Sequence, residues 1–155
     1  MSNKVVLVTG AASGIGAAIA TRFKQNGWLV ASIDQNDAET DLSIQADVSN
    51  FEKVKNAVEQ IESQLGPIDT AVSNAGHYEM KSILEIDNES LIKMMRVHLG
   101  GFKNIALSVL PGMKNRKNGS LICVTSELGI GGGEDRKSTR LNSSHTDISR
   151  MPSSA

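Results

Sequence analysis

A glycine-rich turn near the N-terminus has the residue types and spacing needed to hold phosphate groups. It reads Thr9-Gly10-Ala11-Ala12-Ser13-Gly14-Ile15-Gly16 and stands between a short apolar run and an amphipathic segment, the context in which such a turn carries weight. Gly10 permits the sharp turn, Gly14 lets a pyrophosphate approach the backbone, and Gly16 lets a helix pack closely on a strand. The start of that helix adds free N–H donors and the positive end of a dipole. The turn predicts a dinucleotide site, and a tight turn without a ligand is the alternative.

An acidic residue, Asp34, follows the second apolar run, eighteen residues after Gly16. A carboxylate at that place can accept hydrogen bonds from both ribose hydroxyls of an adenosine and would repel a 2′-phosphate. No Lys or Arg occurs between Gly10 and Gly16 to neutralise such a phosphate. These residues favour NAD(H) over NADP(H) as the cofactor, while an ordinary loop Asp at a strand end is the alternative.

The elements that must position these residues alternate between strands and helices. Apolar, β-branched runs predict strands at 4–9, 28–33, 43–48, 68–73 and 120–125. Helical spacing of apolar residues predicts helices at 15–26, 51–65 and about 88–109, the last ending near Pro111. This alternation implies right-handed crossovers and a parallel sheet covered on both faces. The expected fold class is α/β, a Rossmann-type doubly wound parallel sheet that is truncated after its fifth strand.

Composition and charge exclude several function classes. The chain has 155 residues, of which 39% are hydrophobic and 21% charged, an ordinary globular composition. A net charge of −1 gives no electrostatic reason to expect nucleic acid or a membrane surface as a partner. No apolar run reaches the roughly 18 residues of a membrane span, and the N-terminus lacks signal-peptide features, so the cytoplasm is the expected compartment. The single cysteine, Cys123, is expected to point into the core, and three scattered histidines predict no metal site.

Three motifs in order resemble the short-chain dehydrogenases/reductases. TGAASGIG matches that family's TGxxxGxG variant of the dinucleotide fingerprint, and Asp47-Val48 matches the pair in which the family's Asp contacts the adenine amino group. Asn74-Ala75-Gly76 matches its NAG motif, which steadies the sheet and borders the cofactor. The resemblance covers residues 4 to about 134, roughly half of a typical subunit. It implies hydride transfer between NAD(H) and a small alcohol or ketone substrate, and a homo-oligomer for the intact protein.

The cofactor residues follow from the glycine turn, the acid and the resemblance taken together. They are Thr9, Gly10, Ser13, Gly14, Ile15, Gly16, Asp34, Asp47, Val48, Asn74, Ala75 and Gly76.

Two catalytic positions of the family carry over. Ser126 follows the last expected strand and matches the serine that orients the substrate carbonyl; the carboxyl end of a central strand is where open α/β sheets place their chemistry. His98 stands where the family usually has the Asn of an Asn-x-x-Gly pattern, which holds a water in the proton relay. His98 is therefore either a substitute in that relay or a passive helix residue.

The family's acid/base pair, Tyr-x-x-x-Lys, is missing at the expected spacing. Counting from Ser126 at the family's spacing reaches Thr139, and the Lys position falls on Ser143. A threonine hydroxyl is far too weak an acid to exchange a proton with an alcohol near neutral pH. Tyr78 is the only tyrosine in the chain, has no Lys four residues on, and is expected to line the cofactor cleft. The chain as written is expected to be inactive.

The character of the chain changes at about Asp135. Residues 135–155 hold six serines and only four apolar residues, which predicts a disordered tail. The stretches DRKSTRLNSSH and SRMPSSA resemble, in one reading frame, the translation of a synthetic sequencing adapter. We expect residues 1–134 to form an incomplete NAD-binding domain and residues 135–155 to be an artefact fused to a truncated gene.

Two other function classes remain open at this point. A non-catalytic dinucleotide-binding module would bind NADH without reaction. An S-adenosylmethionine methyltransferase also has a glycine turn after its first strand and an acid after its second, but Asn74-Ala75-Gly76, Ser126 and the glycine spacing count against it. The leading interpretation is an NAD-dependent oxidoreductase.

Overall fold

The computed structural model describes residues 4–79 and 84–126, which form a single sheet with helices on both faces. In chain order the elements are β1 (Val5–Thr9), α1 (Gly14–Gln25), β2 (Leu29–Asp34), β3 (Leu42–Gln45), α2 (Phe51–Leu65), β4 (Ile68–Ser73), α3 (Asn88–Met95), the π-helical turn η1 (Arg96–Gly100), α4 (Gly101–Arg116) and β5 (Ser120–Cys123).

The strands are parallel and lie in the order β3-β2-β1-β4-β5. The chain moves outward from β1 to β3 and then returns to place β4 on the other side of β1. This is the doubly wound α/β topology predicted from the sequence. The reversal lies between β1 and β4, and open sheets of this kind form a ligand crevice outside the carboxyl ends of their strands at that place.

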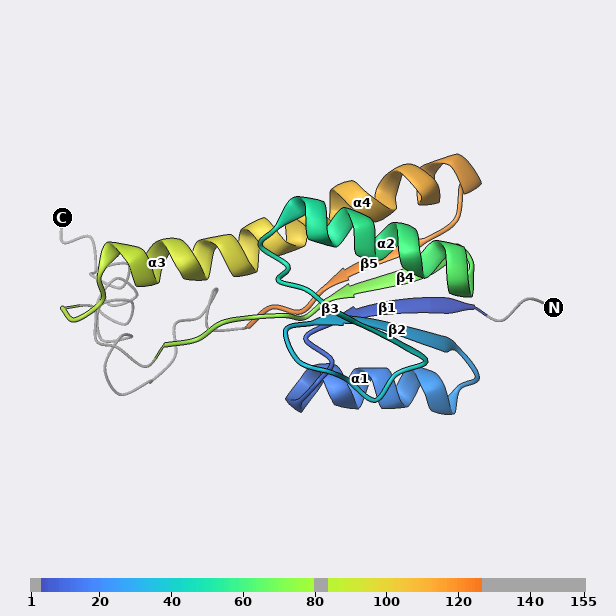
Figure 1. The fold of residues 1–155 in the computed structure, drawn as a ribbon, viewed down its shortest axis with the longest axis horizontal. Helices are drawn as coiled ribbons and strands as arrows, with labels where there is room; N and C mark the ends of the chain where they lie inside the picture. The colour runs from blue at the N-terminus through green and yellow to red at the C-terminus, as the bar shows by residue number, and fades with distance from the viewer. Residues whose placement is uncertain (1–3, 80–83, 127–155) are drawn as a thin grey trace, which may run out of the picture.

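Helices cover the two faces of the sheet (Figure 1). Helix α1 packs on one face, where Ala20 contacts a cluster containing Val6, Val8 and Val30. Helices α2 and α4 lie on the opposite face and bury apolar side chains against Leu7 and its neighbours. Because both of its faces are covered, β1 is apolar at four consecutive positions, and none of its five residues is more than 1% exposed.

The helical segment α3-η1-α4 runs from Asn88 to Arg116 and continues past Pro111. The predicted end near Pro111 is therefore wrong. A proline inside a helix removes one hydrogen bond and crowds the preceding turn, but tertiary contacts beyond it hold the last turn. Met113 is buried, and Arg116 donates from Nη2 to the Ile68 carbonyl oxygen (2.9 Å) while its Nη1 lies 3.6 Å from Glu62 Oε1. The helix ends where Lys117 adopts a left-handed conformation, with φ of 53°.

Strand β5 lies at the edge of the described sheet. Leu121 packs against the α2–α4 cluster, whereas Ile122 on the other side is 45% exposed. Cys123 is also exposed, which corrects the prediction that it points into the core. Helix α4 contacts β5 from the helical layers.

The sequence predicts no membrane span and a disordered tail at 135–155. Within residues 4–79 and 84–126, no helix is long and apolar enough to cross a bilayer. The predicted tail at 135–155, with Thr139 and Ser143, lies outside the described residues.

Candidate functional site

A cleft of about 1240 Å³ opens at the carboxyl ends of β1, β2 and β4. Ten of the twelve residues predicted to bind a cofactor line it: Gly10, Ser13, Gly14, Ile15, Asp34, Asp47, Val48, Asn74, Ala75 and Gly76. Residues of α3 and η1 complete the wall. The two predicted residues that do not line the cleft, Thr9 and Gly16, are buried.

The glycines of the turn have separate roles. Gly10 and Gly14 have positive φ angles of 71° and 55°, a conformation that side chains with a Cβ rarely adopt. A Cβ on Gly16 would lie 2.0 Å from the Gly10 carbonyl oxygen, so no side chain fits between α1 and the turn. A Cβ on Gly14 would meet no atom within 4 Å, so the backbone there is open to the cleft. Gly16 thus serves packing, and Gly14 leaves room for a ligand.

The start of α1 is suited to an anion. Ser13 occupies the N-cap position but makes no capping hydrogen bond with its side chain, and the first turn contains no acidic residue. The N–H groups of a helix start carry partial positive charge and bind phosphate well. The open backbone at Gly14 and this uncapped helix start fit the pyrophosphate of a dinucleotide.

The carboxylate of Asp34 is fixed at the rim of the cleft. Its Oδ2 accepts a hydrogen bond from the N–H of Ala12 (3.0 Å), and its Oδ1 accepts one from the N–H of Asn36 (3.0 Å). An ionised carboxylate has about four acceptor sites, so each oxygen retains capacity for a ligand hydroxyl. The same side chain therefore joins β2 to the glycine turn and presents acceptors to the cleft.

Thr9 connects the glycine turn to Asn74-Ala75-Gly76. Its hydroxyl oxygen accepts hydrogen bonds from the N–H groups of Asn74 and Ala75, each at 3.0 Å. Asn74 in turn donates from Nδ2 to the carbonyl oxygens of Thr9 (3.0 Å) and Gly10 (3.3 Å). Thr9 is only 1% exposed, so it organises the floor of the site from beneath.

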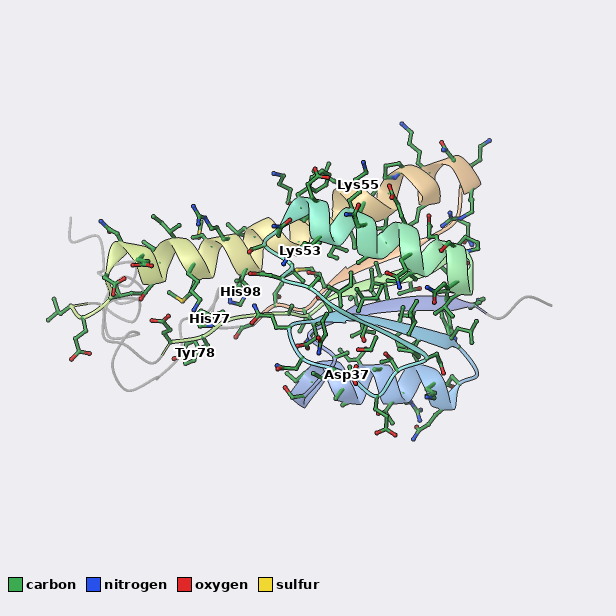
Figure 2. The ribbon with its side chains drawn as sticks, in the orientation of Figure 1. Asp37, Lys53, Lys55, His77, Tyr78 and His98 are labelled. Carbon is green, nitrogen blue, oxygen red and sulfur yellow. The ribbon has the colours of Figure 1, made fainter. Side chains whose placement is uncertain are left out.

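His98 lies against the segment that follows β4 (Figure 2). Its Nε2 is 2.8 Å from the carbonyl oxygen and 3.2 Å from the amide nitrogen of His77. A Cβ on Gly76 would lie 2.7 Å from the Cε1 atom of the His98 ring, so the ring needs glycine there. The structure gives His98 a contact between η1 and this segment, and its role in a proton relay stays a prediction.

Sequence reasoning did not identify every residue of the cleft. His77 lines it and joins its ring Nε2 to Glu79 Oε1 at 2.9 Å; its place directly after Gly76 was the available signal. Tyr78 is 68% exposed and is not among the residues that line the cleft, so the expectation for Tyr78 was wrong.

Ser126 lies three residues beyond the last residue of β5. The N–H of Val124 still donates to the Ser73 carbonyl oxygen (2.9 Å), so the chain follows β4 up to that point. Ser126 is exposed and follows the same carboxyl edge of the sheet at which the glycine turn lies.

A parallel doubly wound sheet with this glycine turn and acid defines a Rossmann-type dinucleotide-binding class of protein. The chain belongs to the short chain dehydrogenase family, whose sequence pattern matches residues 4–137. It is therefore a member of an oxidoreductase family whose proteins generally bind NAD or NADP.

Individual relatives agree with this assignment. A 3-oxoacyl-(acyl-carrier-protein) reductase of Thermotoga maritima is 31% identical over 145 residues, which cover 85% of this chain and 59% of the relative. An uncharacterized oxidoreductase of Schizosaccharomyces pombe is 34% identical over 134 residues, covering 83% of this chain and 52% of the relative. The solved structure of a ligand-free aldohexose dehydrogenase from Thermoplasma acidophilum matches with a TM-score of 0.80 and 29% identity, over 95% of this chain and 58% of that one. The chain spans between half and three fifths of the length of these proteins.

Proposed function

We propose that this chain forms the NAD(H)-binding part of an oxidoreductase that transfers a hydride between the nicotinamide and an alcohol or carbonyl substrate. The observation that carries the proposal is the juxtaposition of the Asp34 carboxylate with the open glycine turn through the Ala12 N–H. One wall of the cleft then offers hydroxyl acceptors and the next offers N–H donors for phosphate.

The position of Asp34 supports NAD(H) over NADP(H). Its negative charge lies beside the place where an adenosine ribose would meet the glycine turn, and a 2′-phosphate there would face a carboxylate at short range. The Lys and Arg residues that line the cleft are Lys93 and Arg96. They belong to α3 and η1, not to the glycine turn beside Asp34.

The nicotinamide would supply the hydride chemistry, and the chain would supply binding and orientation. The glycine turn would hold the pyrophosphate, and Asp34 the ribose. Ser126 would orient the substrate carbonyl by donating a hydrogen bond. The proton step requires an acid that positions 139 and 143 do not provide, since they are Thr and Ser. We therefore propose that the chain as written binds the cofactor without turnover.

Calorimetric titration with NADH and NADPH tests the cofactor proposal. We expect NADH to bind more tightly, and Asp34→Ser to weaken NADH binding by about tenfold or more, since hydrogen bonds to a charged acceptor are lost. Asp37→Ser is the matched control, because Asp37 is an exposed acid three residues after Asp34 that does not line the cleft. Absence of NADH affinity in well-folded protein, or a strong preference for NADPH, would overturn the proposal.

An assay with NADH and a panel of ketones tests the predicted inactivity. We expect no rate above that of buffer. A rate that vanishes in Ser126→Ala would show that the chain is catalytic as written.

Resequencing of the gene tests the proposed origin of residues 135–155. We expect a different continuation after about Glu134, with a tyrosine codon near position 139. A genomic clone that encodes the present residues 135–155 would refute the adapter origin.

A further inference from the structure

A buried amide on α4 is bonded to the wall of the cofactor cleft. Asn104 is 4% exposed, and its Nδ2 donates a 2.9 Å hydrogen bond to the carbonyl oxygen of Val48, which is 56 residues away in the chain. Most buried polar side chains in proteins have a hydrogen-bond partner. The partner of Asn104 is backbone of the segment that lines the cleft.

Helix α4 also contacts the side chain of Val48. A Cβ on Gly101 would lie 2.9 Å from Cγ2 and 3.3 Å from Cβ of Val48, so the Val48 side chain occupies the space that glycine leaves. Gly101 and Asn104 are three residues apart and therefore share one face of the helix. Helix α4 thus contacts Val48 through both its side chain and its carbonyl group.

The segment that these contacts hold lies between two elements. Strand β3 ends at Gln45 and helix α2 begins at Phe51. Between them, the N–H of Ala46 donates to the Asp34 carbonyl oxygen (2.8 Å), and Asp47 Oδ1 accepts from the Ser49 N–H (2.8 Å). The carbonyl oxygen of Val48 accepts its hydrogen bond from Asn104 on α4, so the place of Val48 depends on that helix.

We propose that Asn104 is a positioning residue for the adenine end of the cofactor. Its hydrogen bond holds Val48 at the position in the cleft wall where the adenine ring of NAD(H) packs against Val48. This inference rests on the proposed function, because it assigns Val48 to the adenine. The same helical segment contacts His77, elsewhere on the cleft, through His98 in η1. The segment α3-η1-α4 therefore sets the positions of two separate parts of the cleft wall.

Titration with ADP-ribose, which carries the adenosine half without the nicotinamide, tests this role. Asn104→Leu removes the donor at nearly constant volume, and we expect ADP-ribose to bind about tenfold more weakly. The matched control is Val109→Ala, a substitution on the same helix at a residue 1% exposed in the core beneath. It should lower Tm as much or more and leave ADP-ribose affinity within about twofold of the unsubstituted chain.

The outcomes are distinct. Unchanged affinity in Asn104→Leu, or an equal loss in Val109→Ala, overturns the positioning role. No ADP-ribose binding by the unsubstituted chain overturns the proposed function itself. Should Asn104→Leu fail to fold, Gly101→Ala decides, since its methyl group displaces Val48 directly: a loss of ADP-ribose affinity supports the proposal, and full affinity overturns it.

Discussion

One nitrogen of His98 faces both the donor and the acceptor of a single peptide residue, His77. Nε2 lies 2.8 Å from the His77 carbonyl oxygen and 3.2 Å from its amide nitrogen. With a proton on Nε2 the ring donates to the oxygen, and without it the ring accepts from the N–H, but it cannot do both. At any moment this nitrogen therefore bonds only one of the two backbone groups.

This geometry predicts that a side-chain amide at position 98 stabilises the contact with His77 better than the imidazole does. Glutamine reaches about as far as Nε2 and carries a donor and an acceptor, so His98→Gln should satisfy both groups of His77 and match or exceed the stability of the unsubstituted chain. His98→Leu should lower the free energy of unfolding by about 1 kcal/mol, a modest value because the bond is exposed. Urea unfolding measures both. Equal stability of the Gln and Leu variants would show that the contact contributes nothing.

Substitutions at Gly14 and Gly27 distinguish the effect of backbone strain on NADH binding from the effect of ligand access. Both have positive φ, 55° and 76°, and a Cβ on either would meet no atom within 4 Å. Each Gly→Ala substitution should therefore cost about 1 kcal/mol of stability. Gly14 lines the cleft and Gly27 does not, so only Gly14→Ala should weaken NADH binding, by about tenfold or more. Thermal unfolding and calorimetry provide the two readouts. An equal loss of NADH affinity in Gly27→Ala would mean that strain, rather than access, controls binding.

Local sequence signals were sufficient for most of the fold. Helix 51–65 and strand 68–73 were predicted with the bounds that the structure has, because a Gly-Pro pair and clear periodicities delimit them. The glycine turn was equally readable, since its residue types encode backbone conformation. The exposure of Cys123 was not readable: this residue lies in an apolar run that resembles a buried strand, and whether a strand is covered depends on other elements.

Long-range contacts explain why two contacts of the cleft wall and the end of the last helix were not predicted. The bonds from His98 to His77 and from Asn104 to Val48 join residues 21 and 56 positions apart, and no periodicity marks them. The helix end was misplaced for the same reason, since contacts of Met113 and Arg116 outweigh the local effect of Pro111.

The hydroxyl of Thr9 predicts a coupled loss of stability and binding. Thr9→Val keeps the shape but removes the acceptor for the N–H groups of Asn74 and Ala75. Leaving these donors unsatisfied should cost about 2–3 kcal/mol, and NADH affinity should fall because both residues line the cleft. Thr70→Val is the control, the same chemical change in neighbouring β4 at a position that does not line the cleft. Retained stability and affinity in Thr9→Val would contradict the bonding described.

Pro111 predicts a stabilising substitution. It is exposed and lies inside α4, with five helical residues after it, so the helix there lacks one backbone hydrogen bond. Pro111→Ala restores the N–H that can donate to the Leu107 carbonyl and removes the clash of the ring with the preceding turn. Proline in a helix interior costs ~3 kcal/mol relative to alanine, and we expect a gain of about 1–3 kcal/mol in the free energy of unfolding. The exposed Lys114→Ala, one turn later, should stay within about 0.5 kcal/mol of the unsubstituted chain. A lower Tm for Pro111→Ala would mean that the rigidity proline gives to the unfolded chain outweighs its cost in the helix.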